Sequence, residues 1–306
     1  MSRKGAFLSA IILLLFVSLL AFFTAGCGAG VSRSVSGPSQ LSQETAGEDA
    51  KAGAKTLLRV HFLDVGQADC ILIQVPGGKN VLIDGGNNDD GPAVVSYLKK
   101  QGVRRLDVVV ATHPHEDHVG GLDSVLNAFE AGKVYAPRVT ANTKSFEDFL
   151  LAVQRKGLKI TEARAGMALD LGPAASALFL APAGTGYEDL NDYSAVLKLT
   201  CGGTSFLFTG DAEAVSEAEM LRSGRDLKAD VLKVGHHGSA SSTTAEFLKA
   251  VSPKYAVISV GAGNDYHHPS PKTLARLAAA GVKIFRTDER GTVVVESDGQ
   301  QITVQD

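Results

Sequence analysis

The chain has 306 residues, of which 44% are hydrophobic and 21% are charged. These values are close to those of soluble globular proteins, and they exclude wholesale disorder, collagen-like repeats and a polytopic membrane protein. The formal net charge of −3 provides no general basic field for a phosphate backbone. A nucleic acid would therefore have to be held by a local patch or by metal ions.

The N-terminus carries the pattern of an export signal. Arg3 and Lys4 precede an apolar run over residues 6–23, and small residues lead to Cys27. This segment resembles a bacterial lipoprotein signal, which implies that residues 1–27 are processed and that Cys27 carries the lipid. An uncleaved transmembrane anchor and a fully secreted form are the alternatives. All three place the remainder of the chain outside the cytoplasmic membrane.

A linker is predicted over residues 28–54, where Gly, Ser, Ala, Glu and Gln dominate and apolar side chains are too few to offset the cost of ordering. Residues 55–306 are then the folded domain. With Cys27 lipidated, Cys70 and Cys201 remain, and we expect both to be buried thiols in or beside strands.

The folded part alternates strand-like and helical patterns. In its first half we expect strands at 57–63, 70–75 and 80–83, a helix over 91–101, a buried strand at 107–111, a helix over 122–131, a strand near 134 and a helix after Thr143. In its second half we expect strands at 175–180, 195–199 and 205–208, a helix over 215–223, strands at 230–234 and 254–259 around a helix over 245–250, a helix after Pro271, and strands near 284, 293–295 and 302–304. Two such series indicate an α/β fold of four layers, with two sheets face to face and helices outside.

The loop over residues 111–121 gathers metal-binding side chains directly after a buried strand. His113 and His115 are two residues apart and project to one side of an extended turn, whereas Asp117 and His118 follow the turn and face a second point. Imidazole and carboxylate together suit zinc, manganese or iron, and paired ions in hydrolytic sites lie about 3.5–4 Å apart. The alternative is a polar surface loop in which histidines coincide.

The spacing His-x-His-x-Asp-His resembles the signature of the metallo-β-lactamase superfamily. Asp84 resembles the early strand-end aspartate that supports the metal loop in that family, and Asp211 resembles the later aspartate that bridges two ions. The resemblance implies an αβ/βα metallohydrolase with two divalent ions, zinc or manganese.

A narrower resemblance is to the extracytoplasmic hydrolase domain of the competence protein ComEC and its stand-alone relatives. It rests on segments 64–69, 191–194 and 232–239 and on His268-Pro269, and it covers nearly everything from residue 57 to residue 306. It implies a nuclease or phosphodiesterase, since that domain is linked to degrading the DNA strand that is not imported during uptake.

Individual roles follow from these resemblances. We expect Asp211 at the mouth of its strand, joining both ions and accepting a proton from the nucleophile. We take His236 as the last ligand of the second ion, together with Asp117 and His118. We expect its neighbour His237 to contact the substrate and stabilise the leaving oxygen.

The chain departs from many superfamily members because it has no histidine between His118 and His236. The first ion would then have His113, His115 and Asp211, completed by water or by Asn191. Asn191 and Ser194 are interpreted as an adapted site near the substrate, although Asn191 could simply cap a turn. We expect His268 to reach a substrate phosphate. We expect Asp64, Gln67 and Asp69 either to support the ligands or to stabilise a turn. A solvated helix face is expected for Glu213, Glu217 and Glu219.

These expectations combine into a metal-dependent phosphodiesterase or nuclease that is tethered outside the membrane and acts on a phosphoester, possibly single-stranded DNA. A phosphorylcholine esterase, a lactonase or β-lactamase, and a non-enzymatic envelope-binding scaffold remain as alternatives. No aromatic stacking stripe is evident in the sequence, so the expectation of DNA rests on the resemblance.

Overall fold

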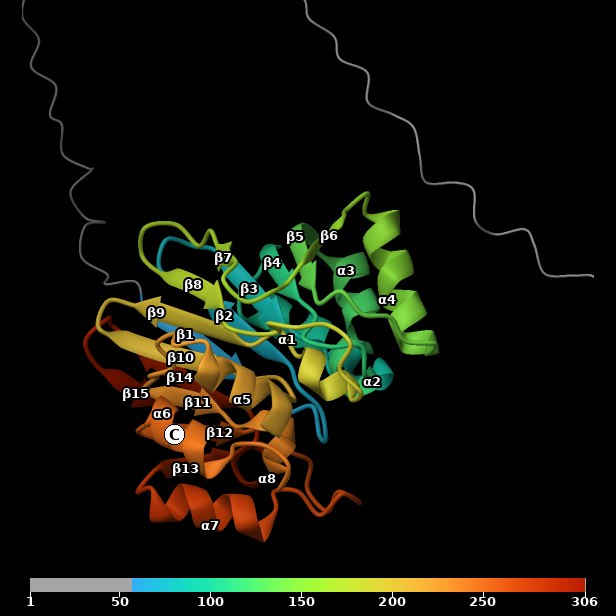
Figure 1. Ribbon diagram of the computed structural model, residues 1–306. Coiled ribbons are helices and arrows are strands. Elements are labelled where there is room, and N and C mark those ends of the chain that lie inside the picture. Colours follow the sequence, from blue (N-terminus) through green and yellow to red (C-terminus); the bar gives the residue numbers. More distant parts are fainter. Residues whose placement is uncertain (1–56, 306) are drawn as a thin grey trace, which may run out of the picture. The chain divides into compact units, whose positions relative to one another are not determined.

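The computed structural model describes residues 57–305 (Figure 1). The signal segment 1–27 with Cys27 and the linker 28–54 lie outside the described residues, so their predictions are untested. Within the described part, no helix combines the length and apolar character needed to cross a membrane.

The first sheet has eight strands in the order β15-β14-β1-β2-β3-β4-β5-β6. The run from β3 to β6 is parallel, and the other pairs are antiparallel. Its strands are β1 (Leu58–Phe62), β2 (Ile71–Gln74), β3 (Asn80–Ile83), β4 (Arg105–Val110), β5 (Glu130–Ala136), β6 (Ile160–Glu162), β14 (Val293–Ser297) and β15 (Ile302–Val304).

The second sheet has seven strands in the order β13-β12-β11-β10-β9-β8-β7. Here β10 to β13 are parallel, and the other pairs are antiparallel. Its strands are β7 (Ala168–Leu169), β8 (Ser176–Phe179), β9 (Leu197–Cys201), β10 (Thr204–Phe208), β11 (Val231–Lys233), β12 (Tyr255–Ile258) and β13 (Lys283–Arg286).

Three longer helices cover each sheet on its outer side (Figure 1). Those on the first sheet are α1 (Gly91–Lys100), α3 (Leu122–Ala128) and α4 (Lys144–Arg155), and those on the second are α5 (Ala214–Arg222), α6 (Ala245–Val251) and α7 (Pro271–Ala279). The short elements are α2 (Glu116–Val119), α8 (Thr287–Arg290) and the 3₁₀ turns η1 (Asn88–Asp90), η2 (Leu190–Tyr193) and η3 (Gly235–Gly238).

Strand alternation divides the core into three apolar layers. On β10, Phe206 and Phe208 face the space between the sheets, whereas Leu207 faces the helices of its own side. On β2, Ile73 faces the space between the sheets, whereas Leu72 faces the helices of the first sheet. Successive side chains of a strand point to opposite faces, so each sheet has two apolar faces to bury. The predicted four-layer αβ/βα sandwich is therefore confirmed.

Some predicted elements differ from those observed. The helix expected over 122–131 ends at Ala128, because the chain turns there into β5. The short α2, β6, β7 and α8 were not predicted, since two to four residues carry too little periodicity. The predicted cap of α4 is confirmed, because the Thr143 side chain accepts a hydrogen bond from the backbone N–H of Phe146. Cys70 and Cys201 are buried and free, as expected.

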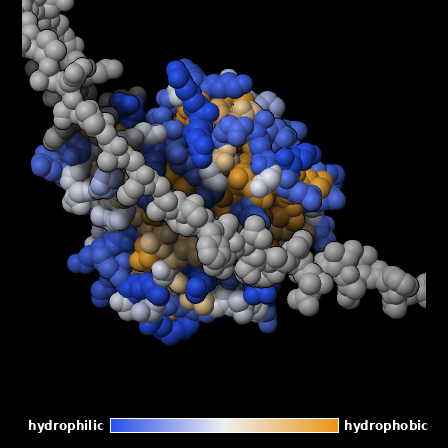
Figure 2. All heavy atoms as spheres, turned by 90° about the horizontal axis from the view of Figure 1, so that it is seen from above, coloured by the Kyte–Doolittle hydropathy of each residue, from blue (hydrophilic) through white to orange (hydrophobic). Residues whose placement is uncertain are grey.

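The surface view in Figure 2 shows mostly hydrophilic residues, with hydrophobic side chains gathered in separate patches between them. Among the described residues, large hydrophobic side chains are exposed at Leu150 and Leu151 on α4, at Val215 on α5 and at Tyr266 in the loop before α7. Tyr266 is the most exposed of these, at 70%.

Candidate metal centre and its cavity

The functional side chains lie just past the carboxyl ends of parallel strands from both sheets. In the first sheet, Asp84 follows β3 and the histidine loop follows β4; in the second, Asp211 follows β10 and His237 follows β11. Ligands of open α/β sheets bind at this end, because the loops there converge while the strands hold them in register.

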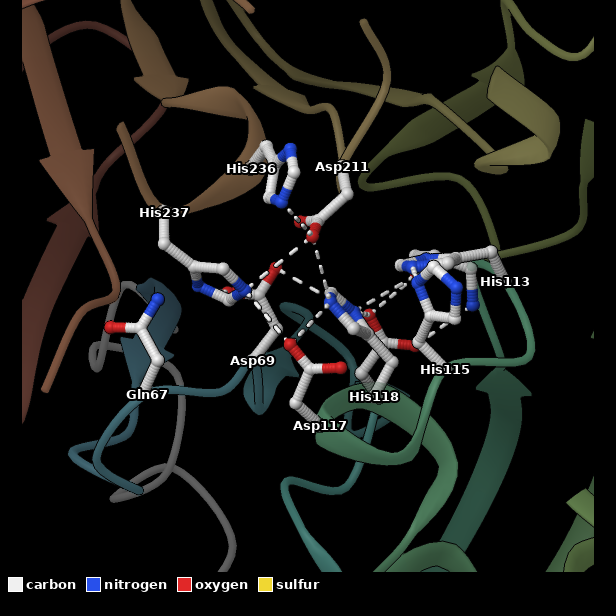
Figure 3. Close-up of polar contacts among 12 residues, drawn as sticks. Gln67, Asp69, His113, His115, Asp117, His118, Asp211, His236 and His237 are labelled. Carbon is white, nitrogen blue, oxygen red and sulfur yellow. Dashed lines mark hydrogen bonds and ion pairs between the residues drawn. The ribbon is translucent and has the colours of Figure 1, made fainter. Parts of the chain in front are cut away.

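Four side chains meet at the centre of this region: Asp117, His118, Asp211 and His237 (Figure 3). One ligand atom from each lies within 4.8 Å of the other three. The His118 Nε2 atom is 3.3 Å from Asp211 Oδ2, and the His237 Nε2 atom is 3.2 Å from Asp117 Oδ2 and 3.5 Å from Asp211 Oδ2. We call these four residues the central cluster.

The central cluster fits a divalent cation. The His118 Nε2 and Asp211 Oδ1 atoms are buried and have no hydrogen-bond partner within the described chain. Buried polar atoms without partners are costly, and two imidazoles with two carboxylates form the donor set expected for zinc, manganese or iron. The residues present therefore fit the metal that was expected.

Asp84 fixes the orientation of His118. Its carboxylate accepts hydrogen bonds from the Thr112 backbone N–H at 2.8 Å, the Thr112 hydroxyl at 2.7 Å and His118 Nδ1 at 2.8 Å. A carboxylate on one ring nitrogen directs the other nitrogen to the metal. The location of Asp84 thus matches the supporting role that the resemblance implied.

A buried ammonium group, which the sequence analysis missed, lies beneath the central cluster. Lys233 Nζ is 2.6 Å from Asp69 Oδ2 and 3.8 Å from Asp211 Oδ1, and it donates a hydrogen bond to the Gly210 carbonyl at 3.2 Å. A second group of ligand atoms, from Asp69, Asp84 and His118, is therefore occupied by Lys233 and by internal hydrogen bonds. Asp69 lies behind the ligands, which is the location that support of the ligands, one of its two expected roles, would require.

The charged groups of the central cluster shift one another's pKa values. Burial alone would lower the pKa of His237, but the carboxylates of Asp211 and Asp117 raise it to about 10. Burial would likewise lower the pKa of His118, yet Asp211, Asp117 and Asp84 raise it well above its usual value. Against the effect of burial, the two imidazoles hold the pKa values of Asp117 and Asp211 below the ordinary range. Without a metal, protons take the place of the cation.

The adjacent histidines have locations opposite to those we expected. His237 directs Nε2 into the central cluster and donates from Nδ1 to the Ser259 carbonyl at 2.9 Å. His236 is 25% exposed and donates from Nδ1 to Glu213 Oε1 at 2.8 Å, while its Nε2 is 3.8 Å from Asp211 Oδ2. The geometry therefore favours His237 over His236 as the ligand.

The reason for this reversal is the backbone. The strand ends at Lys233, and both histidines have left-handed conformations, with φ values of 47° and 50°. Strand alternation consequently stops before His236, and it cannot be used to assign the pair.

The first histidine pair stays close to the central cluster but outside it. His113 Nε2 and His115 Nδ1 are 3.0 Å apart. Neither residue belongs to a group of three or more ligand atoms among the described residues. Burial, followed by the neighbouring His118, lowers the pKa of His113 well below its usual value, so the ring is neutral and able to ligate.

Asn191 and Ser194 have separate roles. Asn191 lies on η2, and its buried Oδ1 has no hydrogen-bond partner within the described chain. Ser194 is fully buried, and its hydroxyl accepts a hydrogen bond from the Asp211 backbone N–H at 3.0 Å. Ser194 therefore positions Asp211, and it is not among the residues that line the cavity.

Asp64 and Gln67, which precede β2, differ in their locations. Asp64 is exposed and accepts a hydrogen bond from the Gly66 backbone N–H at 3.3 Å, so it stabilises the turn. Gln67 accepts a hydrogen bond from the Gly261 backbone N–H at 3.1 Å and lines the cavity.

Glu213, at the N-cap of α5, and Glu217, within α5, are bound to neighbouring groups and do not form a solvated face. Glu217 is 1% exposed, and it accepts hydrogen bonds from the backbone N–H groups of Thr243 and Thr244. Glu213 binds His236, and this hydrogen bond lowers the pKa of its carboxyl. Both glutamates thus hold the loops around the site.

A cavity of about 340 Å³ opens above the central cluster. His268 lies at its wall, where burial, followed by His236 and His237, lowers the pKa to about 4 and keeps the ring neutral near pH 7. The lining residues are Gln67, His115, Glu116, Asp117, Asn191, Asp211, His236, His237, Tyr266 and His268.

Comparison with known proteins supports the same family. Residues 63–262 match the Metallo-beta-lactamase superfamily. The chain is 32% identical over 251 residues to ComE operon protein 3 of Bacillus subtilis (strain 168), covering 76% of this chain and 32% of that protein. It is also 32% identical over 232 residues to competence protein ComA of Neisseria gonorrhoeae, covering 75% and 31% respectively. It therefore spans about a third of the length of these relatives.

Solved structures agree on the fold. The metallo-beta-lactamase fold protein YhfI from Bacillus subtilis matches with a TM-score of 0.52 and 16% identity, over 78% of this chain and 100% of that one. CmlA, a diiron beta-hydroxylase from Streptomyces venezuelae, matches with a TM-score of 0.50 and 14% identity, over 75% and 52%. At these identities the likeness concerns the fold alone. By its family match, its sandwich and its His-x-His-x-Asp-His loop, the chain belongs to the metallo-beta-lactamase superfamily, with ComEC-like competence proteins among its relatives.

Proposed function

We propose that this protein is a metal-dependent phosphodiesterase that cleaves single-stranded DNA outside the cytoplasmic membrane. The observation that carries the proposal is the central cluster at the floor of a polar cavity, in a chain related to competence proteins. Recombination protein 2 of Haemophilus influenzae is 29% identical over 82% of this chain and 30% of that protein. Its name refers to recombination, which is a process of DNA, and this also supports the proposal.

The chain's residues divide into ligands and supports. Asp117, His118, Asp211 and His237 would hold one ion, and His113 with His115, whose Nε2 and Nδ1 atoms are 3.0 Å apart, would hold a second. When bound, such ions lower the pKa of water toward about 7 and stabilise charge on phosphoryl oxygens.

Other side chains prepare the cavity for the substrate. Glu213 accepts a hydrogen bond from His236 Nδ1 and so fixes this ring at the cavity wall, with the amide of Asn191 beside the pair. A protonated Nε2 of His236 would then donate to a phosphate oxygen. His268 presents its neutral ring at the cavity wall. The Asp211 carboxylate lines the cavity and is the group proposed to accept a proton from an attacking water.

The location is part of the proposal and rests on the sequence. The apolar run before Cys27 favours lipid attachment at that cysteine and anchoring on the outer side of the membrane. Growth of the producing cells with a labelled fatty acid tests this directly: the wild-type chain should incorporate the label and Cys27→Ser should not. Absence of label from the wild type would contradict lipid attachment.

The activity is tested by restoring zinc or manganese to the apoprotein and comparing substrates side by side. The panel contains single-stranded DNA, RNA, bis-para-nitrophenyl phosphate, a phosphorylcholine ester and a cephalosporin. We expect phosphodiester cleavage to be fastest, to be stimulated by manganese because Asp117 and Asp211 supply carboxylate oxygens that suit this ion, and to weaken as salt increases. Faster hydrolysis of the phosphorylcholine ester or the lactam would overturn the proposal, and a metal-free, inactive protein would favour a binding scaffold.

A further inference from the structure

An exposed aromatic ring stands at the edge of the catalytic cavity, although the sequence indicated no stacking stripe. Tyr266 is 70% exposed and lines the same cavity as Asp117, Asp211 and His237. Among the described residues that line this cavity, it is the one tyrosine, phenylalanine or tryptophan. A planar partner that stacks on this ring would bury its apolar surface.

The ring is not isolated. Tyr266 and His268 are stacked, with ring centroids 5.8 Å apart and an angle of 27° between planes. The His268 ring meets His236 edge-on at 5.5 Å, and His236 is 6.1 Å from His237, a member of the central cluster. A continuous row of rings thus leads from the candidate metal centre to the surface, and Tyr266 is its outer end.

The loop that carries this ring is tied down by hydrogen bonds. The Asn264 side-chain amide donates to the carbonyls of Gly261 at 2.9 Å and His268 at 2.6 Å, and its Oδ1 accepts from the His268 backbone N–H at 3.0 Å. The Ser270 backbone N–H donates to the Gly238 carbonyl at 2.9 Å, which joins the loop to the turn that carries His236 and His237. A ring held in place before binding loses little freedom when a partner stacks on it.

We propose, on the basis of the phosphodiesterase function above, that Tyr266 backed by His268 is a stacking platform for one unpaired nucleobase next to the scissile phosphate. His268 packs beside the tyrosine ring in an offset stack, and the ring is 70% exposed, so ring surface remains available to a base. In a duplex both faces of an internal base are already stacked, so the platform favours single strands. Since every base has a π-face, it selects for the presence of a base and not for its identity.

The same cavity is poorly suited to choline. Quaternary ammonium groups are held by cages of several aromatic rings. The cavity lining offers one such ring in addition to histidines, and His268 stacks on that ring instead of standing across from it. The geometry therefore favours a flat partner over a spherical cation.

The experiment compares two phosphodiesters that release the same leaving group, thymidine 5′-(para-nitrophenyl phosphate) and methyl para-nitrophenyl phosphate. The proteins are the full-length wild type, Tyr266→Ala and Tyr266→Phe. Leu150→Ala, which removes an exposed side chain on α4 outside this cavity, is the matched control. The measured quantities are kcat and KM for each ester.

We expect Tyr266→Ala to lower kcat/KM for the thymidine ester roughly 5- to 150-fold, mainly through KM, and to leave the methyl ester unchanged. Tyr266→Phe should retain most of the preference, because it keeps the ring. Equal losses on both esters, no loss on either, or a defect of Tyr266→Phe equal to that of Tyr266→Ala would overturn the platform.

A binding assay tests the stacking platform independently of the phosphodiesterase activity. Fluorescence anisotropy with labelled oligothymidylate and with an abasic strand of the same length reports stacking without turnover. Preferential binding of oligothymidylate by the wild type, lost in Tyr266→Ala, supports the platform. If neither ester is cleaved in that case, the proposed phosphodiesterase function is rejected and the platform is not. Equal binding of the two strands, together with hydrolysis of the methyl ester, would reject the platform and leave the phosphodiesterase standing.

Discussion

The Nζ atom of Lys233 lies 2.6 Å from Oδ2 of Asp69, and both side chains are removed from solvent, at 0% and 1% exposed. This ion pair lies directly beneath the candidate metal centre, since the same ammonium group is 3.8 Å from Asp211 Oδ1. Burial alone would lower the pKa of Lys233, yet the carboxylates of Asp69 and Asp211 raise it. The lysine is therefore a fixed positive charge that holds two carboxylates in place.

The first prediction concerns this pair. Lys233→Met should destabilise the protein by about 3–5 kcal/mol, because it leaves the Asp69 carboxylate buried and unpaired. The free energy of unfolding, measured in urea for wild type and variant, checks this value. The double variant Lys233→Met with Asp69→Leu should recover much of the loss. A single variant as stable as the wild type would show that the pair does not hold the site together.

The second prediction separates the adjacent histidines. His237→Ala should lower metal content, because it removes one of four ligand atoms in the central cluster. His236→Ala should retain metal and impair turnover, because its Nδ1 is bound to Glu213 and its ring faces the cavity. Elemental analysis of both purified variants, with activity measured at saturating metal, distinguishes them. Metal loss in His236→Ala alone would restore the assignment drawn from the sequence.

The features that could be predicted from the sequence are those that a pattern of neighbouring residues specifies. The loop with His113, His115, Asp117 and His118 could be recognised because its ligands are close in sequence and follow a buried strand. The two sheets followed from the alternation of strand and helix patterns. Asp84 and Asp211 were identified through resemblance, and the parallel strands before them explain why they meet.

The features that were missed depend on contacts between distant segments. Lys233 interrupts an apolar strand, and a lysine there is usually exposed, so its partner Asp69 could not be identified before the fold was known. The reversal of His236 and His237 requires left-handed backbone conformations, which are uncommon for residues other than glycine. A useful signal was nevertheless present, since a lysine in an apolar strand three residues before a pair of histidines is an unusual pattern.

The third prediction concerns Asp211. Asp211→Asn keeps the volume of the side chain but removes its charge, and it should lose most bound metal and nearly all hydrolysis. Circular dichroism should remain unchanged, because the backbone N–H of residue 211 still donates to Ser194. Titration with zinc or manganese gives the number of ions per chain: we expect two in the wild type. A variant that retains two tightly bound ions would remove Asp211 from the bridging role.

The last prediction is a pH dependence. The pKa of His237 is raised from about 6.5 to about 10 in the metal-free protein, mainly because the carboxylates of Asp211 and Asp117 overcome the effect of burial. A raised pKa contributes stability that is fully present below pH 6.5 and is lost as the pH rises through about 10. Metal binding must displace this proton, so the affinity for metal should change in the opposite direction.

We therefore expect affinity for zinc or manganese to rise about tenfold per pH unit for each displaced proton between pH 6.5 and 8.5. Calorimetric titrations in two buffers of different ionisation enthalpy measure both the affinity and the number of protons released. In metal-free samples, the stability advantage of wild type over His237→Gln should shrink over the same interval, because the imidazole of the unfolded chain loses its proton there while the folded protein keeps it. Proton release of zero, with an affinity that is constant from pH 6.5 to 8.5, would show that His237 is already neutral and that the carboxylates around it do not hold a proton in place of the metal.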